Sequence, residues 1–142
     1  MNTPLETQSE RSTSNIWISG LIGWALAFVG VSTLFGITRL LDIPLQVGGG
    51  PPDWTTLIPL MVAGLIPPTL VPAIVATVLY ALLRLFSKQR ASRIFQVVAV
   101  VALLISFGGP FSLTVSTVNK ITLALMHLVT ATAIVWALTV RK

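Results

Sequence analysis

Three polar side chains near the end of the chain, Lys120, His127 and Thr130, are spaced so that one side of a helix would carry all of them. Positions seven residues apart in a helix point in nearly the same direction, and positions three apart are neighbours. The flanking residues are apolar, so we expect this polar stripe to face the interior of a helix bundle, where Ser106 offers a further hydroxyl. An ionisable group in such a segment is a candidate functional group.

His127 supports four interpretations. It can exchange a proton, act as axial ligand of a haem or a chlorophyll-type pigment, or make a polar contact with a bound ligand. The fourth interpretation is structural, with a neutral imidazole that hydrogen-bonds to Ser106 or to a backbone carbonyl of a neighbouring helix. A single histidine does not build a multi-ligand metal site. We therefore predict no metal site and, in the leading interpretation, no cofactor.

The remaining composition argues against an enzyme. The chain has no cysteine, which excludes disulfides, thiolate metal sites and cysteine nucleophiles. No paired carboxylates are available for acid–base catalysis. A Ser106–His127 pair would lack both an orienting carboxylate and a Gly-x-Ser-x-Gly elbow. We expect no catalytic residues.

The balance of apolar and charged residues indicates a membrane protein. Hydrophobic residues make up 54% of the 142 residues and charged residues only 9%, whereas soluble domains carry about 25% charged residues. Four apolar runs, residues 16–38, 57–86, 94–113 and 121–140, are long enough to cross a hydrocarbon core of about 30 Å. We predict an all-α, four-transmembrane-helix bundle preceded by a polar, disordered or interfacial tail, residues 1–15.

Prolines make the second run unusual. Pro67, Pro68 and Pro72 each lack a backbone N–H and clash with the preceding helical turn. Proline is nevertheless comfortable in the first turn of a helix. We expect either a kink at these residues or a helix that begins properly only near Pro67 or Pro68, after an irregular segment.

Basic residues predict the orientation. Seven Lys and Arg residues would lie on one side of the membrane and two on the other, the larger set being Arg11, Arg84, Lys88, Arg90, Arg93, Arg141 and Lys142. Because cytoplasmic loops carry the excess of Lys and Arg, we expect a cell-membrane protein with both termini in the cytoplasm. This explanation of the net charge of +5 leaves no reason to expect a nucleic-acid partner.

Small residues four apart predict close helix packing. The spacing occurs in all four runs, at Ser19, Gly23 and Ala27, at Ala73, Thr77 and Ala81, at Ala102 and Ser106, and at Ala133 and Ala137. The pattern does not distinguish contacts within one chain from self-association.

Two motifs carry a family resemblance. The first runs from Ala102 through Ser106 to Gly109-Pro110, and the second, from Thr122 to Val129, contains Met126-His127-Leu128. Together they resemble a bacterial family of small four-helix membrane proteins of unknown function, DUF6069. The resemblance implies a four-helix membrane protein of the bacterial inner membrane and implies no activity, substrate or cofactor.

These observations favour a non-enzymatic accessory subunit or helix-packing partner, in contact with the lipid bilayer and with other membrane chains or copies of itself. Two alternatives stay open. A small-solute or lipid transporter would use the stripe at His127, but no acidic or basic residue lies deep in any run, and small four-helix multidrug pumps depend on a glutamate that residues 16–38 lack. A haem- or pigment-binding protein would use His127 as a ligand.

Overall fold

The computed structural model describes residues 4–43, 45, 64–87 and 89–140, and describes side chains in the first helix from Asn15 onward. The elements are α1 (Pro4–Leu40), α3 (Ile66–Phe86), α4 (Ala91–Ser106), α5 (Gly108–Ser112) and α6 (Thr117–Thr139). Strands are absent from these residues. Helices α1, α3 and α6, together with the combined segment α4–α5, are the four segments long and apolar enough to cross a membrane. The prediction of an all-α protein with four spans is confirmed.

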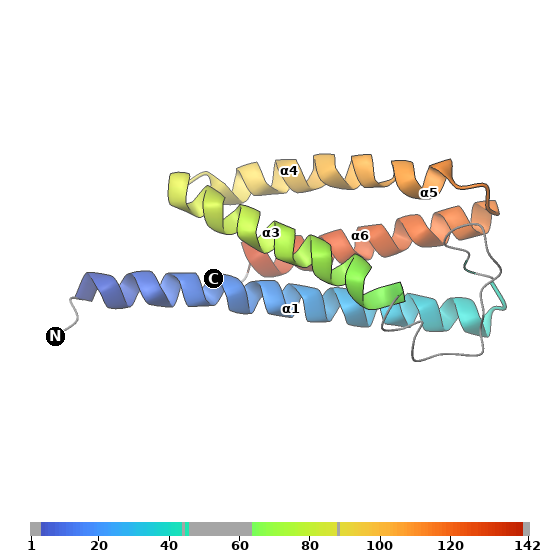
Figure 1. Ribbon diagram of the computed structural model, residues 1–142, viewed down its shortest axis with the longest axis horizontal. Coiled ribbons are helices and arrows are strands. Elements are labelled where there is room, and N and C mark those ends of the chain that lie inside the picture. The colour runs from blue at the N-terminus through green and yellow to red at the C-terminus, as the bar shows by residue number, and fades with distance from the viewer. Residues whose placement is uncertain (1–3, 44, 46–63, 88, 141–142) are drawn as a thin grey trace.

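The helices run up and down (Figure 1). The start of α1, the α3–α4 turn and the end of α6 lie at one end, which we call the hairpin end. The end of α1, the start of α3, α5 and the start of α6 lie at the other, which we call the loop end. Helix α1 makes its largest contact with α6 and a smaller one with α3, whereas α4 contacts α3, α5 and α6 and, among the described helices, not α1. Helices α1 and α4 are therefore diagonal in the bundle.

Helix α1 begins at Pro4, so the polar segment before Asn15, which we expected to be disordered or interfacial, is helical from Pro4 onward. Proline suits the first position of a helix, and no glycine or further proline interrupts the ten residues after it. Extending an existing helix by one residue also costs far less than nucleating a new one. The polar segment follows the helical state of the apolar span behind it.

A Schellman motif ends α1. The amide of Ile43 donates to the carbonyl of Thr38 at 2.9 Å, and the amide of Asp42 donates to the carbonyl of Arg39 at 3.3 Å. Asp42 between them has a φ of 51°, the left-handed conformation that this motif needs. The chain therefore stops the helix with an aspartate at the position where glycine is most common.

Helix α3 starts at Ile66, with Pro67 and Pro68 in its first turn. The expectation that a firm helix begins near these prolines agrees with this start. The hydroxyl of Thr69 donates to the carbonyls of Leu65 and Ile66 at 2.8 and 3.0 Å. Pro72 lies inside the helix; the kink predicted there remains a prediction. The part of the predicted second span before Gly64 lies outside the described residues.

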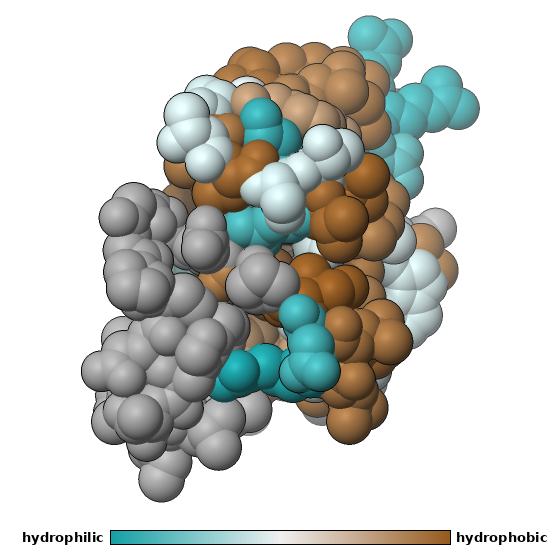
Figure 2. All heavy atoms as spheres, turned by 90° about the vertical axis from the view of Figure 1, so that its right-hand side faces the viewer, coloured by the Kyte–Doolittle hydropathy of each residue, from teal (hydrophilic) through white to brown (hydrophobic). Residues whose placement is uncertain are grey.

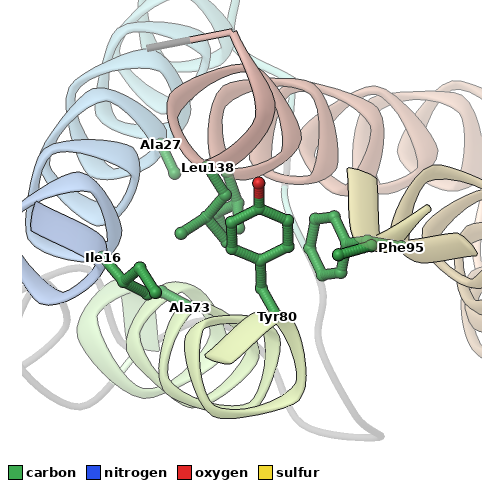
Figure 3. Packing of buried hydrophobic residues seen from close by; sticks show 8 residues of the cluster. Ile16, Ala27, Ala73, Tyr80, Phe95 and Leu138 are labelled. Carbon is green, nitrogen blue, oxygen red and sulfur yellow. The ribbon is translucent and has the colours of Figure 1, made fainter. Parts of the chain in front are cut away.

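Side chains of α1, α3, α4 and α6 meet at the hairpin end in one cluster (Figure 3). The ring of Tyr80 stands edge-on to that of Phe95, with 5.1 Å between centroids, and its hydroxyl lies 3.1 Å from that of Ser92. Ala27 and Leu138 of α1 and α6 complete this side of the cluster. Tyr80 and Phe95 therefore hold α3 against α4 close to the turn that joins them.

Small residues bring α1 close to its neighbours. Gly23 lies against Ile134 and Ala137, where an added Cβ would stand 3.1 Å from the Cα of Ile134. Ala27 and Ala137 are fully buried. Since lipid gives helices little hydrophobic reason to associate, this steric fit is the main source of stability. The predicted small-residue face of the first span is therefore a packed face.

Hydrophobic residues form most of the described surface seen from the loop end (Figure 2). Exposed Leu, Ile, Val, Phe and Trp side chains occur on all four spans. A surface of this kind suits lipid and not water, because soluble monomers rarely expose contiguous apolar patches larger than a few hundred square ångströms.

Candidate functional site around His127

Helix α6 presents the predicted polar stripe, and its start is fixed by a side-chain cap. The Ser116 hydroxyl accepts a hydrogen bond from the backbone amide of Asn119 at 3.3 Å. Thr130 is buried, whereas Lys120 and His127 are half-buried. Lys120 donates from its Nζ to the carbonyl of Phe111 in α5 at 3.2 Å. The side of α6 that carries Lys120, and His127 two turns later, therefore faces the α4–α5 segment.

His127 bonds within its own helix. Its Nδ1 lies 2.8 Å from the carbonyl oxygen of Leu123, one turn earlier. The expected partners, Ser106 or a carbonyl of a neighbouring helix, are not the ones used. The cause is geometric, because the carbonyl four residues back lies within reach of a helical side chain without any movement of another helix.

This hydrogen bond fixes the tautomer of the imidazole. A carbonyl oxygen can only accept, so Nδ1 must carry the proton. In the neutral ring, Nε2 then holds the free lone pair. Among the described residues, Nε2 has no hydrogen-bond partner, and it does not belong to the buried unpartnered atoms. Nε2 is therefore an accessible acceptor, and Nδ1–H bonded to a backbone carbonyl is also the arrangement found behind many ligating histidines.

The other predicted polar residues are also satisfied locally. The hydroxyl of Thr130 donates to the carbonyl of Met126 at 2.9 Å, and that of Ser106 donates to the carbonyl of Leu103 at 2.7 Å. Lys120, His127, Thr130 and Ser106 therefore share no hydrogen bond with one another. The stripe exists as a set of positions on α6 and not as a connected network.

The chemistry open to this arrangement is narrow. Within the described residues, no group of three or more His, Asp or Glu side chains could hold a metal ion. The Ser106 hydroxyl donates to the carbonyl of Leu103 and is not paired with His127. What remains is one acceptor nitrogen in an apolar setting, which suits a polar contact to a ligand or to another helix.

Helix α4 is the least buried of the four spans. In the most apolar stretch of its span 11% of the residues are buried, compared with 22–33% in the other three spans. Its buried residues are Ala91 and Phe95, both near the α3–α4 turn. Ala102 follows Phe95 by two turns on the same side of the helix, yet it is exposed, and Ser106 is only half-buried. The described helices of the same chain therefore leave Ala102 uncovered, because α3 and α4 diverge beyond their turn (Figure 1).

The chain was compared with models of known protein families. The model of a family of unknown function, DUF6069, matches residues 11–142. The chain belongs to this family. No curated protein and no solved structure matches it. The resemblance seen in the two motifs is thereby confirmed for nearly the whole chain, and the family assignment adds no activity.

The two motifs of this DUF6069 protein now have structural positions. Ser106 ends α4, and Gly108, Gly109 and Pro110 form α5 after a break at Phe107. Pro110 is buried against the bundle, whereas added Cβ atoms at Gly108 and Gly109 would meet nothing within 4 Å. Met126-His127-Leu128 lies in the middle of α6, where Met126 packs against the cluster of Val31, Phe35 and Leu123. The first motif shapes the loop end and the second spans the core and the α4–α5 side of α6.

Sequence reasoning missed polar atoms on α1 of the DUF6069 protein. The indole N–H of Trp24 and the hydroxyl of Ser32 are buried without a partner in the described part of the chain. The available signal was a tryptophan in the middle of an apolar run, away from the interface where indole is usual. A groove of about 390 Å³ lies on another side of α6, lined by Leu128, Val129, Thr132, Ala133 and Trp136. His127 is not part of its lining.

Proposed function

We propose that this protein is a non-enzymatic subunit of a membrane complex, and that α4 is the helix through which it contacts a second membrane chain. The observation that carries the proposal is the exposure of Ala102 on the side of α4 that carries buried Phe95. In a bundle closed by its own helices this side would be covered. A helix from another chain can pack there because small residues permit close approach.

The polar side chains support a role without chemistry. Thr33, Thr69, Thr77, Thr122, Thr130, Thr132 and Thr139 each donate to a carbonyl of their own helix. These bonds satisfy the hydroxyls without assembling reactive groups. Hydroxyls bonded in this way support a role in which the spans act through packing surfaces.

Cross-linking tests the contact on α4. The chain has no cysteine, so Ala102→Cys places a single thiol on the proposed face. Val100→Cys, on the far side of α4 with 57% of its side chain exposed, is the matched control. In native membranes we expect a discrete adduct from position 102 and none from position 100. The mass of the adduct distinguishes a second copy of this chain from a different chain. The proposal would be refuted if both positions cross-linked equally, and to lipid only.

A second candidate function rests on the tautomer of His127. We propose that Nε2 accepts a hydrogen bond from a small solute or lipid headgroup moved by a transporter, or ligates a haem or chlorophyll-type pigment. The Nδ1–H bond to Leu123 supports it, because that bond holds the lone pair at Nε2. A visible absorbance band lost in His127→Gln would support a pigment. Unchanged solute binding and unchanged flux in His127→Gln would refute the transporter interpretation.

We further propose a cell-membrane location with both termini in the cytoplasm. Arg84, Arg90 and Arg93 lie at the hairpin end, whereas Arg39 and Lys120 lie towards the loop end. The excess of basic residues favours the hairpin end as cytoplasmic.

A further inference from the structure

Three guanidinium groups gather at the hairpin end. Arg84 is in the last turn of α3, Arg90 is the residue that precedes α4, and Arg93 lies in the first turn of α4. Arg84 follows Tyr80 by one turn and shares its side of α3, which faces α4 through Ser92 and Phe95. Arg84, Arg90 and Arg93 thus flank the α3–α4 turn, which forms one corner of the hairpin end, and Arg90 and Arg93 share the exposed side of α4.

Among the described side chains, Asp42 is the only carboxylate, and it lies at the loop end. No Asp or Glu follows Asp53 in the sequence. Among the described residues, the side chains of Arg84, Arg90 and Arg93 have neither a hydrogen-bond nor an ion-pair partner, and Arg90 and Arg93 are exposed. The first turn of α4 has no acidic residue and no side-chain cap. The positive end of the α4 dipole adds to the same potential.

The corner is held rigid by the packing beneath it. Ala91 and Phe95 are 1% and 2% exposed, and the Tyr80 hydroxyl reaches Ser92 at 3.1 Å. The Tyr80 and Phe95 rings pack α3 against α4, one turn before Arg84 and within the turn after Arg93 (Figure 3). A charged surface on a rigid support loses less conformational entropy when a ligand binds.

Apolar side chains border the charges. Leu85 and Phe86, next to Arg84 in the last turn of α3, are 75% and 87% exposed. They are the last residues of a span, so they lie where the hydrocarbon core meets the headgroups. A free phosphate ion has no apolar part that could contact Leu85 and Phe86, whereas a phospholipid carries both a phosphate and acyl chains.

We propose that the α3–α4 turn binds the headgroup of an anionic phospholipid, with Arg90 and Arg93 on the phosphate and Arg84 beside them. Guanidinium groups match phosphate oxygens through paired N–H donors. Leu85 and Phe86 contact the glycerol and upper acyl chains of the same lipid. This lipid contact is independent of the proposed role of α4.

The experiment measures lipid retention. The protein is purified in detergent, mixed with equal amounts of phosphatidylglycerol and phosphatidylcholine, and examined by native mass spectrometry. The variant is Arg90→Gln combined with Arg93→Gln, both at exposed positions. The matched control is Lys120→Gln at the loop end, a half-buried cation bonded to Phe111. Melting curves confirm that each variant is folded.

We expect wild type and Lys120→Gln to retain phosphatidylglycerol in preference to phosphatidylcholine. The double variant should lose this preference by about thirtyfold, because each cation near an anionic headgroup contributes about 1 kcal/mol. Equal retention of the two lipids by wild type would overturn the proposal. So would an unchanged preference in the double variant, or displacement of phosphatidylglycerol by millimolar inorganic phosphate, which would assign the corner to free phosphate.

Discussion

Gly20 of α1 lies directly against the hydroxyl of Thr77 in α3, so close that a Cβ on Gly20 would overlap Oγ1 of Thr77. That hydroxyl is itself held by the carbonyl of Ala73 at 2.7 Å. The threonine satisfies its polar group inside its own helix, and its outer surface then serves as packing for α1. This contact sets how closely α1 and α3 approach.

Gly20→Ala should therefore destabilise the protein by about 1–3 kcal/mol, the usual cost of overpacking a close contact. Gly36→Ala is the matched control, because an added Cβ there meets nothing within 4 Å. It should be neutral or raise stability by up to about 1 kcal/mol through helix propensity. Unfolding by a denaturing detergent in mixed micelles measures both. Thr77→Ala should rescue Gly20→Ala, and absence of rescue would place the strain elsewhere.

The Tyr80–Ser92 contact predicts a small hydrogen-bond effect and a large packing effect. Tyr80→Phe keeps the edge-on contact with Phe95 and removes the bond of 3.1 Å. It should cost about 0.5–1.5 kcal/mol, and less in a membrane, where such bonds average about 0.6 kcal/mol. Tyr80→Ala should cost about 3–5 kcal/mol by leaving a cavity.

Ser92→Ala is the control for the bond itself. It should cost about as much as Tyr80→Phe, and the two changes together should cost no more than either alone. Additive losses would mean that the two hydroxyls act through other partners.

Asp42 predicts a stabilising substitution at the end of α1. Its φ of 51° is strained for a residue with a Cβ, and its negative charge lies at the negative end of the helix dipole. Asp42→Gly should raise stability by about 1 kcal/mol, because glycine adopts this conformation freely. Thermal unfolding in detergent measures the gain.

Asp42→Asn and Asp42→Val separate the two causes. Asparagine removes the charge and tolerates the conformation, so it should gain about 0.3–1 kcal/mol. Valine also removes the charge but resists a positive φ, so it should lose stability. A gain with valine would refute the conformational explanation.

The sequence predicted the number of spans well, because long apolar runs have few alternatives in water or lipid. It also predicted the packed face of Gly23 and Ala27, since small residues four apart mark close helix contacts. It did not decide what covers Ala102 and Ser106, which have the same spacing but lie where α4 leaves α3. Spacing shows that a face can pack, and only the arrangement of the helices shows what covers it.

The site was less predictable than the fold. The positions of Lys120, His127 and Thr130 on α6 followed from helical periodicity, but their hydrogen bonds did not. Each side chain has a choice between a carbonyl of a neighbouring segment and one on its own helix. His127 and Thr130 use their own helix, and Lys120 reaches α5. Hydrogen bonds to the same helix and to a neighbouring segment have similar free energies, so a sequence alone does not show which one a side chain makes.

His127→Gln should cost less than about 1.5 kcal/mol of stability, since it breaks a hydrogen bond within one helix and none between helices. Unfolding in mixed micelles measures the loss. Leu123→Ala is the contrasting variant. It removes a buried side chain from the cluster that Leu123 forms with Val31 and Phe35, and it should cost about 2–5 kcal/mol of stability. A loss at His127 as large as that at Leu123 would show that the imidazole holds two helices together.

The orientation of the bundle can be tested with single cysteines, because the chain has none of its own. Gln89→Cys and Thr114→Cys place exposed thiols at the hairpin end and the loop end. If the hairpin end is cytoplasmic, an impermeant maleimide should label position 114 in intact cells, and position 89 only after the membrane is opened. The opposite order would reverse the proposed topology.

Val29→Cys, 61% exposed in the middle of α1, supplies the control for membrane insertion. Maleimides react with the thiolate, and a charged thiolate is strongly disfavoured in hydrocarbon, where no water solvates it. Position 29 should therefore stay unlabelled even in opened membranes, and become labelled once a denaturant unfolds the protein. Rapid labelling at position 29 in membranes would mean that this surface faces water, and that its exposed apolar residues serve a soluble partner rather than lipid.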